Sequence, residues 1–338
     1  MAAETTPLAA FRNGVVFFAA LAAASSALST LAGFPSLGNL TRKYQHIVDH
    51  GADYSLVYVG SSRVFHEFIP ARFDAELAAR GHTVGSFNFG QDGMWPPESF
   101  YLLRKILAAR PARLKWVLVD LMGIRPELEG SETTLRAIYW HDLHHTWIAL
   151  RHIIETAENG RRTVPEKLLA CLHHSGLFLQ RSCSLGTGHR QLELLLGLKQ
   201  RKTPVEVTDG GYEPGKPGPL DGNQRATFLA ALGGLKRNPQ PRPIPASFRD
   251  ALATITADVR AAGAEPVFVV ASNLYGAERF TDWPPAGVTV LAFDDPEKYA
   301  QLYDPYHRFD PHHLDPAGAE DFTRLLAARF AELLDTKR

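Results

Sequence analysis

The chain has little cysteine and no excess of either charge. Only Cys171 and Cys183 occur among its 338 residues, and no C-x-x-C pair is present, which excludes a zinc ribbon and a thioredoxin-type motif. The two cysteines either form a disulfide in an extracytoplasmic domain or serve as small apolar core residues. Lysine plus arginine and aspartate plus glutamate number 36 each, so basic charge is not concentrated and we expect no nucleic-acid partner.

The sequence also lacks low-complexity tracts and internal repeats, whereas apolar residues are plentiful. They make up 45% of the chain against 21% charged residues, which is enough for a substantial core and excludes extensive disorder. The length suits one large α/β domain with an insertion, or two small domains.

An uncharged apolar run, residues 15–34 (VVFFAALAAASSALSTLAGF), lies near the N-terminus. It is about as long as a helix that crosses a bilayer, so we expect a signal anchor. A signal peptide cleaved near residues 25–27 and a buried apolar helix are the alternatives. Arg12 precedes the run and Arg42 and Lys43 follow it, which slightly favours a cytoplasmic location for the part that follows.

From about residue 53, apolar runs of strand length alternate with helical patterns. Strand patterns occur at residues 54–59, 84–89, 114–121, 266–271 and 288–293, and helical patterns at 70–80, 96–110, 246–263 and 316–334. This alternation predicts a three-layer, flavodoxin-like α/β sandwich with a mainly parallel sheet. Ligands of such sheets bind beyond the carboxyl ends of the strands.

Residues 131–222 interrupt the alternation. They comprise a stretch rich in leucine, histidine and arginine that we expect to be a helical insertion over the site, and then a loop rich in glycine and proline. The expected organisation is therefore an N-terminal membrane or signal segment (1–36), the first part of the α/β domain (37–130), the insertion (131–222) and the second part of the domain (223–338).

The insertion holds a group of potential metal ligands. They are His141, Asp142, His144, His145, His173 and His174. Imidazole and carboxylate groups suit zinc, but consecutive residues of a helix point in different directions. We therefore expect surface or cap-lining histidines, with no metal site and no cofactor.

The first candidate loop, residues 60–63 (Gly-Ser-Ser-Arg), follows the first strand pattern and precedes a helix. It places the Ser62 hydroxyl at the carboxyl edge of the sheet, beside free helix N–H groups that favour developing negative charge. A phosphate-binding turn or a simple helix cap would use the same residue types. The loop is not the G-x-S-x-G elbow of α/β-hydrolases.

Two further loops end at the same edge of the predicted sheet. Residues 88–93 (Asn-Phe-Gly-Gln-Asp-Gly) offer glycine N–H groups to an oxyanion, although an ordinary strand-to-helix turn explains them equally. In the stretch from Asp310 to His313, the carboxylate can bind one imidazole nitrogen while the other faces a serine. A surface acidic pair or a helix cap is the alternative there.

The order of these three blocks resembles the SGNH (GDSL-like) hydrolase superfamily. Ser62 stands in the position of the family's nucleophile, and residues 310–314 (Asp-Pro-His-His-Leu) are similar to its last block. The resemblance implies a serine ester hydrolase in which His313 is the base, Asp310 orients it, and Gly93 or Gly90 donates to the oxyanion.

One block departs from the family pattern. The loop at residues 120–125 lacks the Asn that the family places after its third strand. Asn88, Arg63 and Asn273 are the candidates to replace this donor, whose loss would cost roughly 3 kcal/mol of transition-state stabilisation.

Similar departures occur in membrane-anchored SGNH branches with a Gly-Ser-Ser-Arg loop. This resemblance implies a single N-terminal anchor, an extracytoplasmic (periplasmic) catalytic domain, and a substrate that is an O-acyl, mainly acetyl, ester of an exported glycan or lipid. The alternatives are an O-acyltransferase with the same triad, supplied by a membrane acyl-donor partner, and a catalytically inactive SGNH-fold protein that binds polysaccharide.

Overall fold

The computed structural model describes residues 7–121, 123–125, 134–156, 163–185, 188–197, 207–237, 243–274, 282 and 284–336. Met122, in the loop where the SGNH resemblance expects an Asn, lies outside the described residues, as do residues 126–133, which span the predicted boundary between the first part of the α/β domain and the insertion. The chain forms two compact units. One comprises Met1–Thr41 and Glu127–Val205, and the other comprises Arg42–Pro126 and Glu206–Arg338.

The second unit is built on a five-stranded sheet with the strand order β2-β1-β3-β4-β5, in which every neighbouring pair is parallel. The strands are β1 (Leu56–Gly60), β2 (Ser86–Gly90), β3 (Trp116–Asp120), β4 (Glu265–Val270) and β5 (Val290–Ala292). From β1 the chain passes to β2 on one side and then to β3 on the other. A crevice for ligands is therefore expected at the carboxyl ends of β1 and its neighbours.

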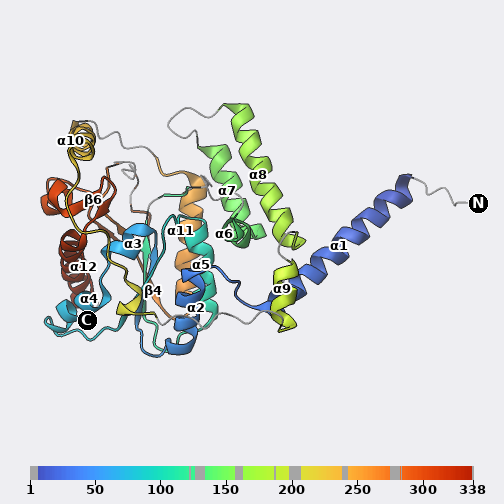
Figure 1. Ribbon diagram of the computed structural model, residues 1–338, viewed down its shortest axis with the longest axis horizontal. Helices are drawn as coiled ribbons and strands as arrows, with labels where there is room; N and C mark the ends of the chain where they lie inside the picture. The colour runs from blue at the N-terminus through green and yellow to red at the C-terminus, as the bar shows by residue number, and fades with distance from the viewer. Residues whose placement is uncertain are drawn as a thin grey trace, which may run out of the picture. The chain divides into compact units, whose positions relative to one another are not determined.

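Helices flank this sheet (Figure 1). They are α2 (Asn39–His50), which begins in the first unit, α3 (Ser62–Glu67), α4 (Pro70–Ala78), α5 (Glu98–Ala108), α11 (Ala246–Ala261) and α12 (Pro316–Thr336). A further helix, α10 (Gly222–Arg237), contacts the segment Pro305–His307. α3, α4 and α12 pack together over the sheet face that bears Leu56 and Tyr58, whereas α5 and α11 pack against each other and contact β1 and β4. The predicted α/β class is confirmed, and strand bounds differ from the predicted runs by one or two residues.

Short elements complete the second unit. They are the 3₁₀ helices η2 (Asp209–Gly211), η3 (Ala300–Tyr303) and η4 (Pro305–His307), and a two-stranded antiparallel hairpin of β6 (Arg308–Asp310) and β7 (His313–Leu314). Among them, η2 lies against the edge strand β2. The hairpin leads directly into α12, whose side chains Phe322, Leu326 and Phe330 are buried in the core, as their helical spacing predicts.

The first unit is helical. It contains α1 (Pro7–Ala32), α6 (Leu135–Trp140), α7 (Leu143–Glu155), α8 (Val164–Ser182) and α9 (Gly188–Leu195). Over Pro7–Leu28, α1 is long and apolar enough to cross a membrane and is almost entirely exposed. It could be a membrane anchor or a signal sequence, since both have this length and composition.

The two cysteines do not form a disulfide. Cys171 lies within α8 and Cys183 caps its C-terminus, and both are free. Twelve residues of helix separate their Cα atoms by roughly 18 Å, whereas a disulfide needs less than about 7 Å. The disulfide alternative is therefore wrong.

Candidate active site

The turn between β1 and α3 holds Ser62 at the carboxyl edge of the sheet. Asp120, the last residue of the neighbouring β3, accepts hydrogen bonds from Ser61 N at 3.1 Å and from Ser61 Oγ at 2.5 Å. Gly60 is required here because a Cβ on it would lie 2.2 Å from the Asp120 Cβ. Ser61 also caps α3 by accepting from Arg63 N.

Burial raises the pKa of the Asp120 carboxyl, and the hydrogen bonds from Ser61 oppose that effect. The two hydrogen bonds to Asp120 hold Ser61, the residue before Ser62, in position. Ser62 itself is largely buried, with 8% of the residue exposed.

Asn88 and Gly90 hold α3 on β2. The Asn88 side chain donates to the carbonyls of Val64 at 2.6 Å and Phe68 at 2.8 Å, and its oxygen accepts from Gly90 N at 2.8 Å. A Cβ on Gly90 would lie 2.2 Å from Phe65 N, so the glycine permits the close approach of the helix. The donors of Asn88 and Gly90 are used in this packing, and the oxyanion role expected for these two residues stays a prediction.

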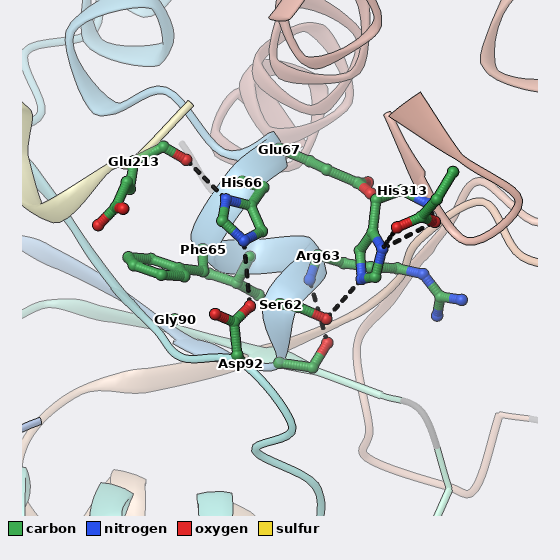
Figure 2. Close-up of polar contacts among 12 residues, drawn as sticks. Ser62, Arg63, Phe65, His66, Glu67, Gly90, Asp92, Glu213 and His313 are labelled. Carbon is green, nitrogen blue, oxygen red and sulfur yellow. Dashed lines mark hydrogen bonds and ion pairs between the residues drawn. The ribbon is translucent and has the colours of Figure 1, made fainter. Parts of the chain in front are cut away.

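Ser62, His313 and Asp310 form a continuous hydrogen-bonded chain. Ser62 Oγ lies 2.6 Å from His313 Nε2, as Figure 2 shows, and His313 Nδ1 lies 2.8 Å from Asp310 Oδ2. Because the carboxylate can only accept, Nδ1 carries the proton and Nε2 is left to accept from the serine hydroxyl. This is the arrangement that activates a serine nucleophile.

Asp310 is held as a carboxylate by its surroundings. Burial alone would raise the pKa of Asp310, but the hydrogen bond and charge of His313 and the His312 N–H together lower it below the usual value. Asp310 Oδ1 accepts from the backbone N–H groups of His312 at 2.7 Å and His313 at 2.9 Å, so the same side chain closes the β6–β7 hairpin.

The backbone on both sides of His313 is fixed by side chains of α3, the helix that begins at Ser62. Arg63 Nε donates to His312 O at 3.3 Å, and Glu67 Oε1 accepts from Leu314 N at 3.1 Å. We call this pair of contacts the α3 clamp. It couples the position of the imidazole to the position of the serine.

A buried arginine anchors the hairpin from the other side. Arg308, fully buried at the start of β6, donates to Ser272 Oγ at 3.1 Å and to Leu302 O at 2.5 Å. Its guanidinium also lies 4.9 Å from the centre of the Phe228 ring. Burial lowers the pKa of Arg308 to about 10, so the group stays charged at neutral pH.

Glu67 is the buried acid beside this hairpin. Burial raises the pKa of the Glu67 carboxyl, and the charges of Arg63, His313 and Arg308 only partly offset this effect.

A second imidazole lies one helical turn after Ser62. His66 Nε2 is 3.0 Å from Asp92 Oδ1 and His66 Nδ1 is 2.8 Å from Glu213 O, so both ring nitrogens face acceptors. Burial would lower the pKa of His66, but the Asp92 carboxylate and the Glu213 carbonyl outweigh it and raise the pKa. The His66 ring lies edge-on to His313, with 6.2 Å between their centres (Figure 2).

Sequence reasoning missed His66, Glu67 and Arg308. The signal for His66 was available, because residues four apart share one face of a helix and His66 therefore lies on the Ser62 side of α3. Nothing in the sequence singled out Glu67 or Arg308, since the role of Glu67 arises from its contact with β7 and that of Arg308 from its contacts with Ser272 and Leu302.

The other expected oxyanion donors are Arg63, Asn273 and Gly93, and each has a different environment. Arg63 is directed to His312 O, and the Asn273 side chain donates to Ala271 O at 3.2 Å at the end of β4. Gly93 lies one residue after Asp92 with a φ of +61°, and a Cβ on it would meet open space. Its oxyanion role stays a prediction.

The histidines of the helical unit pair with one another. His141 Nδ1 lies 2.5 Å from Ala137 O, so this nitrogen donates, and His141 Nε2 accepts from His174 Nδ1 at 2.8 Å. Burial lowers the pKa of His141 to about 3, which keeps it neutral. His145 binds Asp142 at 2.8 Å instead. Among the described residues, no three histidine, cysteine or acidic side chains come together as metal ligands.

No known family model matches the chain, and it has no match among curated proteins or solved structures.

Proposed function

We propose that this protein is a serine ester hydrolase of the SGNH type, with Ser62 as its nucleophile. The observation that carries the proposal is the hydrogen-bonded chain from Ser62 Oγ through His313 to Asp310, at 2.6 Å and 2.8 Å. The serine and the acid–base pair come from segments some 250 positions apart, and they meet at the carboxyl edge of a parallel sheet, where ligands of such folds bind.

The reaction proceeds in two halves. His313 Nε2 takes the Ser62 proton as Oγ bonds to the ester carbonyl carbon, and the C–O bond to the alcohol then breaks as His313 returns the proton to the alcohol oxygen. Water attacks the acyl-enzyme with His313 again as base, which releases the carboxylic acid and restores the serine. Asp310 stabilises the imidazolium, and backbone N–H groups at Ser62 and Gly93 receive the oxyanion.

The substrates that we propose are O-acyl, chiefly acetyl, esters of an exported glycan or lipid. α1, which is long and apolar enough to be an anchor, supports attachment to a membrane. The extracytoplasmic side and the ester substrates are supported by the resemblance of the nucleophile loop to anchored SGNH branches.

A fluorophosphonate probe tests the proposal. The full chain should become labelled on Ser62, and Ser62→Ala should abolish both labelling and hydrolysis of p-nitrophenyl acetate. Ser175→Ala is the matched control, because it removes a serine hydroxyl that donates to Cys171 O within α8 and does not belong to the candidate site. A folded wild-type chain that resists labelling, or a labelled Ser62→Ala variant, would contradict the proposal. Circular dichroism establishes the fold of each variant.

A second candidate is a catalytically inactive SGNH-fold protein that binds polysaccharide. It is favoured by the side-chain amides of Asn88 and Asn273, which are committed to main-chain carbonyls and leave the oxyanion without a side-chain amide from either residue. The same probe separates the two candidates, because phosphonylation requires an activated serine.

A further inference from the structure

The C-terminal part of α1 packs within the helical unit. Ser25 Oγ donates to Arg181 O at 3.4 Å and contacts Ser184 Oγ, so α1 lies against the C-terminal end of α8. α9 also packs along α1, and Figure 1 shows the N-terminal part of α1 extending away from these contacts. α1 therefore has an exposed apolar part and a part in contact with α8 and α9.

The position of Ser25 fixes the depth of the C-terminal end of α8 if α1 crosses a bilayer. The candidate span ends at Leu28, three residues beyond Ser25. Three residues of helix correspond to about 5 Å. The contact between α1 and the other two helices therefore lies at the edge of the hydrocarbon layer, in the region of the lipid headgroups.

The same part of the unit exposes large apolar side chains. Leu179 of α8, Leu185 after it, Leu192 and Leu195 of α9, and Leu196 are between 41% and 62% exposed. We call these residues the leucine surface. A group of exposed leucines on one short stretch of chain is unusual for a surface in water and marks an interaction site. Helices with an apolar and a polar face commonly lie in the plane of the membrane interface.

We propose that the leucine surface is embedded in the boundary between lipid headgroups and acyl chains, so that the helical unit lies on the membrane as well as being tethered to it. The occupant is lipid because the tether holds this surface beside the bilayer continuously, which gives lipid an advantage in local concentration over any soluble partner. This inference rests on the proposed role of α1 as a membrane anchor.

Site-specific fluorescence quenching tests the inference on the full chain. Cys171→Ser and Cys183→Ser remove the native thiols. Leu192→Cys and Leu196→Cys then introduce single labelling sites for an environment-sensitive fluorophore. Ala20→Cys on α1 reports on the anchor, and Leu229→Cys on α10, an exposed leucine of the other unit, is the matched aqueous control. Each variant is placed in nanodiscs that hold one chain, with either a nitroxide-bearing lipid or aqueous iodide as the quencher.

The lipid quencher should reduce the fluorescence at positions 192 and 196 as it does at position 20, and iodide should quench position 229 instead. Quenching of 192 and 196 by iodide alone, with position 20 still quenched by lipid, would overturn this inference and leave the anchor intact. Protection of 192 and 196 from both quenchers would indicate a protein contact and would also overturn it. Absence of lipid quenching at position 20 would refute the anchor and the inference together.

Discussion

Glu67 accepts a hydrogen bond from the Leu314 N–H at 3.1 Å, and this contact joins the helix of the nucleophile to the strand of the base. Arg63, at the other end of the same helix, holds His312 O. The residues on both sides of His313 are thus bound by α3, a helix of six residues that begins at Ser62. The geometry of the candidate site is therefore built into one short helix and one hairpin.

Glu67→Ala should uncouple the base from the nucleophile. The Leu314 N–H loses its buried acceptor, at a cost of about 2 kcal/mol in the free energy of unfolding. Without this contact His313 should be less well positioned against Ser62, and kcat for p-nitrophenyl acetate should fall about 100-fold, because small misplacements of catalytic groups are costly. Glu67→Gln is the matched control, because the amide oxygen of glutamine can accept the same hydrogen bond from the Leu314 N–H. Its kcat should be near that of the wild type. Equal kcat values for the Ala and Gln variants would show that the α3 clamp does not position His313.

Much of the fold could be predicted from the sequence because buried parallel strands are continuous apolar runs that end at turns. The Ser62 loop and the Asp310–His313 block were found for the same reason, since each adjoins a recognisable strand or helix. The roles of Asn88 and Gly90 could not be predicted. The Asn88 amide donates to carbonyls of α3 and its C-cap, and the Gly90 N–H donates to the Asn88 side chain. These pairings depend on three-dimensional contacts that no local sequence pattern encodes.

Gly90→Ala should destabilise the fold strongly, because the new Cβ would stand 2.2 Å from the backbone nitrogen of Phe65. We expect a loss of about 3 kcal/mol in the free energy of unfolding. Gly93→Ala is the comparison, since its Cβ enters open space and only the positive φ of 61° opposes it. That strain costs about 1 kcal/mol. Urea denaturation of both variants measures the difference, and a Gly90→Ala variant as stable as Gly93→Ala would refute the packing role.

His66 should stabilise the protein in a pH-dependent way. Its folded-state pKa is raised above 6.5, so its contribution is complete below that value and is lost as the pH rises through the folded pKa. The destabilisation caused by His66→Gln should therefore be larger at about pH 5.5 than at about pH 9. Asp92→Asn, which removes the carboxylate partner, should reduce the same pH dependence. Urea unfolding at both pH values measures it, and equal destabilisation at the two pH values would contradict a protonated His66.

Asp310→Asn should separate the catalytic role of this side chain from its structural role. The amide oxygen can still accept from the His312 and His313 N–H groups, so the hairpin and the free energy of unfolding should be preserved. The amide no longer supplies a negative charge beside His313 Nδ1, and the imidazolium formed during attack loses its stabilisation. We expect kcat to fall about 10⁴-fold, as in a serine triad that loses this carboxylate. Asp310→Ala should lose the hairpin contacts as well and unfold at lower urea concentration. If Asp310→Asn kept full activity, His313 would not depend on Asp310 as its partner.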